Sequence, residues 1–176
     1  MKNLTQYLQE KLIIENSEND YGYQPKTKEE LQEIIKQRIA KEGNKADLND
    51  IDVSHITDMS RLFNGSEFNG DISQWDVSNV KNMFSMFAFS QFNGDISQWD
   101  VSNVKNMSNM FYHSDFNQDI SNWDVSNVEN MSMMFNHSDF NQDISNWDVS
   151  NVENAPNMFV YSPLEIKNKY KPKFNE

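Results

Sequence analysis

The chain has 176 residues, of which 37% are hydrophobic and 12% aromatic, enough for one domain with a buried core. Its formal net charge of −12 argues against a protein that binds nucleic acid or an anionic membrane, because both need a basic surface. There is no cysteine, which excludes disulfides, thiolate metal sites and a cysteine nucleophile.

The first residues show neither the apolar segment nor the small-residue cleavage site of an export signal. No segment approaches the run of about 18 apolar residues that a membrane span needs. We therefore expect a cytoplasmic protein, or a cell-surface protein if an export signal has been removed.

Residues 1–43 do not repeat, and their pattern predicts a helical N-terminal cap. Thr27 is a suitable N-cap residue with Glu30 three positions later, which is a capping box, and Gly43 is placed to end the helix. One apolar face of this helix is formed by Leu31, Ile34, Ile35 and Ile39. We expect a shorter helix over residues 4–14.

Residues 44–163 repeat with a period of 24, which predicts stacked coils. The alignment rests on Trp75, Trp99, Trp123 and Trp147. Complete units start at Phe68, Phe92, Phe116 and Phe140. A degenerate unit, "LNDIDVSHITDMSRLF", precedes them from Leu48, which makes five coils in all. We expect residues 164–176 to form a C-terminal cap or tail.

The spacing inside one unit predicts a short strand followed by a short helix. Trp75 and Val77 alternate with polar residues, as in a strand with one buried face. Apolar residues then follow at helical spacing, namely Val80, Met83, Met86 and Phe87. The predicted fold is an α/β repeat solenoid that is leucine-rich-repeat-like. It has one short parallel strand and one short helix per 24-residue coil.

The units resemble the BspA-like leucine-rich repeat family. The resemblance is to the branch built on "FNxDISxWDVSNVxNMxxMF" units, found in mycoplasma surface lipoproteins and in gut and oral bacteria, and it covers residues 44–163. It implies a bacterial surface protein that binds host or bacterial partners. This chain differs in having neither an export signal nor a cysteine to carry a lipid.

One aspartate of each unit is predicted to face outward on the strand, and we call these residues the acidic column. Its members are Asp52, Asp76, Asp100, Asp124 and Asp148. Neighbouring coils lie about 4.8 Å apart, where like charges repel by ~0.9 kcal/mol in water. Internal hydrogen bonds from serine or asparagine, a basic partner or a bound cation would each relieve that repulsion.

Most other repeated residues have a structural interpretation. We expect a second set of aspartates to close turns through backbone hydrogen bonds: Asp71, Asp95, Asp119 and Asp143. A set of asparagines is expected to bond the adjacent coil: Asn79, Asn103, Asn127 and Asn151. The methionines and tryptophans are expected in the core.

The coils differ from one another mainly at residues 84–91, 108–115 and 132–139. Phe89 in the first of these segments is either an exposed aromatic anchor or a filler of the loop core. His113 and His137 stand one period apart and would be neighbours. They are either solvated loop histidines or a two-histidine metal site.

No catalytic motif is present, and identical coils give paired carboxylates identical environments, so we expect no enzyme, no metal and no cofactor. The predicted function is a non-enzymatic protein-interaction module that presents an acidic polar face to a protein partner with a basic segment. The candidate partner-binding residues are Gln74, Asp76, Ser78, Gln98, Asp100, Ser102, Asn122, Asp124, Ser126, Asn146 and Asp148.

The alternative function is a small acidic structural protein or a decoy that mimics nucleic acid, encoded by a virus or mobile element. For either function we expect no nucleic acid or membrane as a partner. We expect a monomer or a weak end-to-end oligomer, because the ends of a stack of coils carry unpaired backbone groups.

Overall fold

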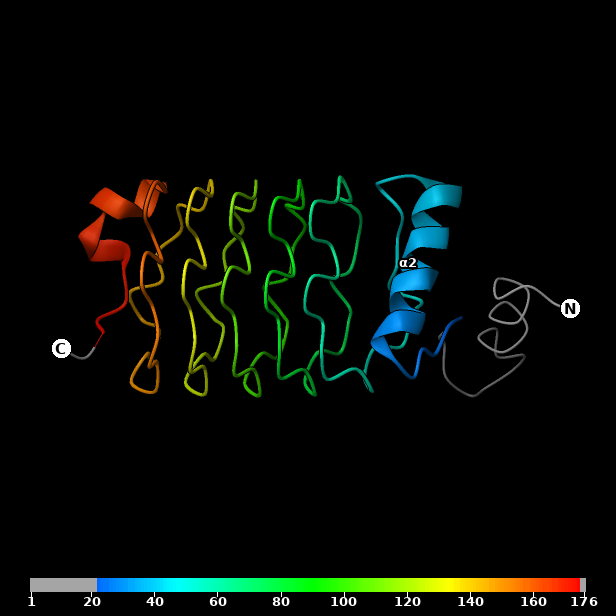
Figure 1. Cartoon of the computed structure of the whole chain (residues 1–176), viewed down its shortest axis with the longest axis horizontal. Coiled ribbons are helices and arrows are strands. Elements are labelled where there is room, and N and C mark those ends of the chain that lie inside the picture. Colours follow the sequence, from blue (N-terminus) through cyan, green and yellow to red (C-terminus); the bar gives the residue numbers. More distant parts are fainter. Residues whose placement is uncertain (1–21, 175–176) are drawn as a thin grey trace, which may run out of the picture.

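The computed structural model describes residues 22–174, which form a helix, a stack of coils and a short helical segment (Figure 1). Helix α2 (Lys28–Glu42) lies at one end of the stack. The 3-10 helices η1 (Pro163–Ile166) and η2 (Asn168–Tyr170) lie at the other end. The helix expected over residues 4–14 lies outside the described residues.

Helix α2 begins and ends where the sequence predicts. The Thr27 side chain accepts the backbone N–H of Glu30 at 3.2 Å, and the Glu30 carboxylate accepts the N–H of Lys26 at 2.7 Å. The returning bond of the capping box thus goes to the residue before the N-cap. Gly43 ends the helix at φ 84°, and its N–H donates to the carbonyl of Ile39. Leu31, Ile34 and Ile35 are buried, as expected.

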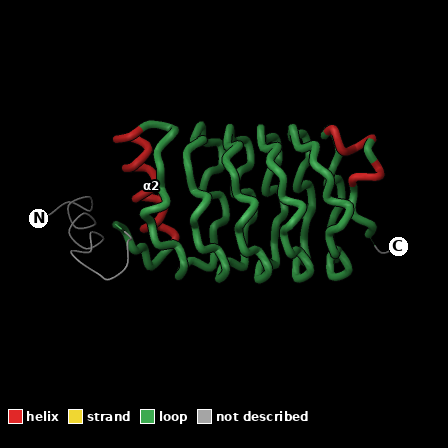
Figure 2. The backbone as a smooth tube through the Cα atoms, turned by 180° about the vertical axis from the view of Figure 1, so that it is seen from behind, coloured by secondary structure: helices red, strands yellow, loops and turns green. Residues whose placement is uncertain are grey.

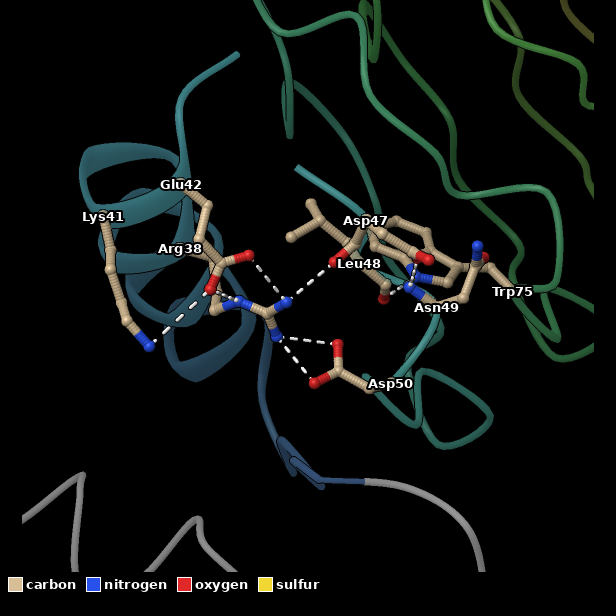
Figure 3. Close-up of polar contacts among 8 residues, drawn as sticks. All are labelled: Arg38, Lys41, Glu42, Asp47, Leu48, Asn49, Asp50 and Trp75. Atoms are coloured by element: carbon tan, nitrogen blue, oxygen red, sulfur yellow. Dashed lines mark hydrogen bonds and ion pairs between the residues drawn. The ribbon is translucent and has the colours of Figure 1, made fainter. Parts of the chain in front are cut away.

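The Arg38 side chain links α2 to the first coil through hydrogen bonds (Figure 3). Its guanidinium donates to both carboxylate oxygens of Asp50 at 2.7 Å and to the carbonyl of Asp47 at 2.7 Å. It also pairs with Glu42 on its own helix, at 2.9 Å and 3.0 Å. Burial lowers the pKa of Arg38, but the hydrogen bonds with Glu42 and Asp50 outweigh it and raise the pKa overall. The bidentate contact fixes the angle between helix and stack.

The core consists of columns of equivalent side chains, one from each coil. The phenylalanine rings that end each repeat stack at centroid distances of 5.5–6.1 Å, and they are Phe63, Phe87, Phe111, Phe135 and Phe159. The predicted methionines are fully buried, namely Met83, Met86, Met107, Met110, Met131 and Met134. The four tryptophans are also buried, and each indole N–H donates to a backbone carbonyl of the preceding coil.

The strand expected at residues 74–78 is absent, and two consecutive turns take its place. The N–H of Trp75 donates to the carbonyl of Ile72 at 3.2 Å, and that of Val80 to Val77 at 2.9 Å. Figure 2 shows no strand anywhere in the described residues. The alternation of buried and exposed side chains is kept, because successive turns also direct neighbouring side chains to opposite sides.

The helix expected at residues 80–87 is also absent, because its N–H groups bond the next coil. Met83, Ser85 and Phe87 donate to carbonyls of the following unit at 2.9–3.0 Å, which leaves no i→i−4 bonds. Ser85 and Phe89 have left-handed backbone, with φ of 53° and 57°. The same conformation recurs every 24 residues, at Arg61, Asn109, Met133 and Asn157 and at Gly65, His113, His137 and Tyr161.

One residue of each coil forms a parallel β-bridge with its neighbours, and together these bridges set the register. The bridges link Asp58, Asn82, Asn106, Asn130 and Asn154 in succession. Pairing in steps of 24 residues along the whole stack explains why every core column is continuous. The assignment of these coils to the leucine-rich repeat class stays a prediction.

We predict that Gly70→Ala destabilises the fold more than Gly94→Ala does. A Cβ at residue 70 would overlap the backbone carbonyl oxygen of Ala46, which cannot move away cheaply. At residue 94 the nearest atoms belong to the Phe92 ring, at 2.8 Å, and the nearest backbone atom is 3.2 Å away. Overpacking of this kind costs about 1–3 kcal/mol.

Urea unfolding of the two variants measures this difference. Gly94→Ala is the matched control, because both glycines hold the same place in the repeat and precede an aspartate. Equal free energies of unfolding for the two variants would contradict the close approach of the first two coils.

Candidate functional site

Four members of the acidic column lie at the surface, and each of its five carboxylates closes a turn. Asp76 Oδ1 accepts the backbone N–H of Ser78 at 3.0 Å and the hydroxyl of Ser78 at 2.6 Å. The same backbone bond recurs throughout the column, at 3.0 Å in each coil. Asp52 is buried, whereas the four aspartates of the complete repeats are exposed. Internal hydrogen bonding thus engages one oxygen of each carboxylate.

These hydrogen bonds favour the charged carboxylate. The bonds from Ser126 lower the pKa of Asp124, although burial and the charge of Asp148 act in the opposite sense. Bonds from Ser150 likewise lower the pKa of Asp148. For Asp124 and Asp148 these hydrogen bonds therefore favour the charged form although the two carboxylates are neighbours.

The other aspartate and asparagine columns have the structural roles that the sequence predicts. Asp71, like its equivalents, accepts the N–H of the serine two residues later at 2.9–3.0 Å. The Asn79 side chain donates to the Ser54 carbonyl of the preceding coil at 2.9 Å, and its equivalents do the same. These residues hold the coils in place.

The remaining candidate residues flank the acidic column. Gln74, Gln98, Asn122 and Asn146 are exposed, one residue before each tryptophan. Asn146 donates to the carbonyl of Ser121, and the Gln74 and Gln98 amides donate to the adjacent serine hydroxyls. Ser78, Ser102 and Ser126 are half-buried. The structure thus brings the candidate residues together as neighbouring rows on successive turns.

No lysine or arginine forms an ion pair with Asp76, Asp100, Asp124 or Asp148 within residues 22–174. The ion pair inside the complete repeats joins Lys105 to Glu129 at 2.9 Å, between exposed side chains. Within these residues no ion pair therefore offsets the charge of the four exposed aspartates.

A second surface feature is a column of rings that the sequence only partly indicates, and we call it the outer ring column. It consists of Phe89, His113, His137 and Tyr161. The first three rings stack at centroid distances of 5.2 and 4.2 Å, and Tyr161 lies 4.3 Å from His137 with its ring tilted by 41°. Phe89 and Tyr161 are 56% and 70% exposed, so Phe89 is a surface residue and not a filler of the core. All four have left-handed backbone, which turns these side chains outward.

The two histidines stack face to face and do not form a chelating pair. Their ring planes are within 8° of parallel, so the nitrogen lone pairs, which lie in those planes, do not converge on one point. His137 Nδ1 contacts the Asn136 side-chain oxygen at 2.5 Å. Burial, and to a smaller extent the charge of His137, lowers the pKa of His113. The geometry gives no support to the two-histidine metal site.

Among residues 22–174, no three histidine, aspartate or glutamate side chains gather closely enough to hold a metal ion. Within the same residues no helix has the length and apolar character needed to cross a membrane.

Fold and surface together describe a repeat protein with coils of 24 residues, a helix over one end and long rows of identical surface residues. A scan of protein families matches the family described as "Mycoplasma protein of unknown function, DUF285" over residues 30–115 and 90–164. The chain belongs to this bacterial repeat family. Neither the curated proteins nor the solved structures contain a match to the chain.

We predict that Ser126→Ala raises the pKa of Asp124 toward the ordinary value of about 3.9. The variant removes the hydroxyl donor and keeps the backbone N–H, so the rise is partial. NMR titration of the carboxyl carbons measures it, with Asp119 as the control because its pKa is lowered by Ser121. An Asp124 that titrates at the ordinary value in the parent protein would be the contrary result.

The same shifts predict how stability depends on pH. Folded-state pKa values below those of the unfolded chain stabilise the protein above the unfolded values, and this contribution is lost as the pH falls through the folded values. We expect the free energy of unfolding to decline below about pH 5, and the decline to be shallower in Ser126→Ala. Urea unfolding at a series of pH values measures both slopes.

We predict that His137→Gln raises the pKa of His113, because it removes the neighbouring charge. The value stays below the ordinary one, since burial is the larger cause. Proton NMR titration of the imidazole measures the change. Phe89→Leu, which alters the other stacked neighbour without removing a charge, is the matched control. A fall or no change in His137→Gln would contradict the stacked arrangement.

Proposed function

We propose that the protein is a non-enzymatic interaction module whose acidic column binds a basic segment of a protein partner. The observation that carries the proposal is the row of four exposed carboxylates on successive coils, which lack a cationic partner within residues 22–174. Their serine neighbours occupy one oxygen of each carboxylate, and the second oxygen is left to accept from a ligand.

Electrostatics favour this occupant over others. At the spacing of neighbouring chains, about 4.8 Å, like charges repel by ~0.9 kcal/mol in water and ~3.5 kcal/mol at an effective dielectric of 20. A segment with regularly placed lysines or arginines would relieve this repulsion. Such an interface speeds association and weakens as salt increases.

The repetition itself argues for binding and against catalysis. An acid and a base of one active site need different environments to separate their pKa values. Equivalent aspartates here have the same serine partner and nearly the same hydrogen-bond lengths in each coil. A uniform row suits recognition of a repeating charge pattern.

We also propose that the coils are a solenoid of the leucine-rich repeat type and that their finer relationship is to the BspA-like repeats. The 24-residue period, the continuous core columns and the asparagine bonds between coils support this. In this proposal, turns replace the strand and helix of each unit, and the molecule is a monomer or associates weakly through its ends.

Binding of a short blocked peptide of alternating lysine and serine tests the proposed function. We predict that the double variant Asp100→Asn/Asp124→Asn binds about fivefold more weakly, since two favourable charge contacts are lost. Asparagine retains the oxygen that closes each turn, so the fold is expected to be unaffected. Isothermal titration calorimetry at low and high salt provides the affinities.

The matched control is Asp95→Asn/Asp119→Asn, which removes the same charge from the same two coils at the other turn. The control is expected to bind nearly as well as the parent. If both double variants weaken binding equally, overall charge and not the acidic column is responsible, and the proposal fails.

A further inference from the structure

Along residues 83–89 and their equivalents, which we call the outer segment, the backbone N–H groups that bond another coil all donate to the following coil. Met83, Ser85, Phe87 and Phe89 donate to Asn106, Ser108, Met110 and Tyr112 at 2.7–3.0 Å. The next coils repeat this pattern, and the last of these bonds join Met131, Met133, Phe135 and His137 to Asn154, Pro156, Met158 and Val160. In this segment each coil thus turns the carbonyls that bond another coil toward α2 and the corresponding N–H groups toward the C-terminal end. Outside it the direction is reversed, since Lys81, Asn82 and Gln91 donate to the preceding coil.

At the last coil this arrangement leaves a row of donors, which we call the donor edge. It consists of the backbone N–H groups of Ala155, Asn157, Phe159 and Tyr161, each 24 residues after a paired equivalent. Within the described residues the first three have no acceptor. Asn154, Pro156 and Asn157 are exposed, so this part of the edge is open to a ligand.

The fourth donor, the N–H of Tyr161, shows that this edge can bind a carboxylate. The N–H of Tyr161 donates to a carboxylate oxygen of Glu165, from helix η1, at 2.8 Å. Asn157 and Tyr161 have left-handed backbone, with φ of 58° and 60°. Backbone N–H groups in alternating right- and left-handed conformations form concave binding sites for anions.

The charge of the surrounding chain agrees with an anionic ligand. Residues 44–163 carry 4 basic and 17 acidic side chains, whereas residues 164–176 carry 4 basic and 2 acidic ones. The basic residues are Lys167, Lys169, Lys171 and Lys173, which lie between, in and after the two short helices beside the last coil (Figure 1). Lys169 and Lys173 are exposed.

We propose that the donor edge binds an extended acidic segment of a partner protein. The segment's backbone carbonyls accept the N–H groups of Ala155, Asn157 and Phe159, as the carbonyls of each coil do for the coil before it. Its carboxylates face the lysines of the C-terminal segment. Nucleic acid is disfavoured, because the net charge of −12 repels a long polyanion. This site is separate from the acidic column and takes a ligand of opposite charge.

NMR titration of the full chain with a short blocked peptide of alternating glutamate and serine tests the proposal. The amide signals of Ala155, Asn157 and Phe159 are expected to shift with a common affinity. The paired equivalents in the preceding coil serve as internal controls and are expected not to shift, namely Met131, Met133 and Phe135. A lysine–serine peptide is expected to leave the donor edge unchanged.

Charge variants separate the site from general electrostatics. Lys169→Glu/Lys173→Glu is expected to weaken binding about tenfold, while Lys41→Glu/Lys45→Glu, at the opposite end of the stack, changes it little. Glu165→Ala frees the fourth donor and is expected to strengthen binding, a gain that simple destabilisation would not produce.

Three results would overturn the proposal. The first is an absence of shifts at the three amides when the acidic peptide is added. The second is equal weakening in the two lysine double variants. The third is a single-stranded oligonucleotide that binds the edge as tightly as the peptide. None of these results bears on the acidic column, which is tested with the lysine peptide.

Discussion

Each coil depends on its neighbours, because its backbone groups have few partners inside the coil itself. In the segment that follows each buried methionine, alternate N–H groups bond the next coil and alternate carbonyls bond the previous one. A buried N–H or C=O without a partner costs as much as a lost hydrogen bond, so one isolated unit would be unstable. Stacking is therefore the condition for folding, and the identical period of the units follows from it.

Side chains close the turns that the backbone cannot close alone. Asp71, Asp76 and Asn82 each accept an N–H two residues later. The equivalents of Asp71 and Asp76 do the same in the other complete coils, as do Asn106 and Asn130. Asn154 differs because Pro156 has no N–H. The surface aspartates therefore both stabilise the turns and contribute negative charge to the surface. One oxygen holds the turn, and the charge remains available to a ligand.

The two ends of the stack meet different requirements along the outer segment, because the bonds between coils there have a direction. Toward α2 the stack presents carbonyls, and a helix covers this end with Arg38 anchored on Asp50. Toward the C-terminal end it presents N–H groups, and of these Tyr161 is satisfied by Glu165. The final segment is basic, whereas the coils that precede it are acidic. The two binding surfaces that we propose therefore lie apart, one along the coils and one at the C-terminal end of the stack.

Much of the fold is predictable from the sequence, since the period, the buried columns and helix α2 depend on residue spacing and capping residues. The backbone conformation inside each coil is not predictable from the sequence in this way. The spacing of Met83, Met86 and Phe87 fits a helix, and nothing about Ser85 or Phe89 indicates left-handed backbone, which such residues seldom adopt. The Asp-x-Ser pairs do indicate turns, and they were the signal against a strand.

The candidate site was predictable to a similar extent. The acidic column follows from position alone, because the residue between Trp75 and Val77 must face outward. The members of the outer ring column follow from the repeat period, because steps of 24 residues lead from Phe89 to Tyr161. Its exposure could not be foreseen, because it depends on backbone that turns these side chains away from the core. The donor edge depends entirely on hydrogen-bond direction, which no residue type encodes.

Hydrogen exchange of individual amides tests the directional bonding between coils most directly. We predict slow exchange at Met107, Asn109 and Phe111, whose N–H groups bond the next coil, and fast exchange at the equivalent Ala155, Asn157 and Phe159 in the free protein. Equal protection at the two sets would contradict it, as would a pattern of protection typical of a helix over residues 80–87.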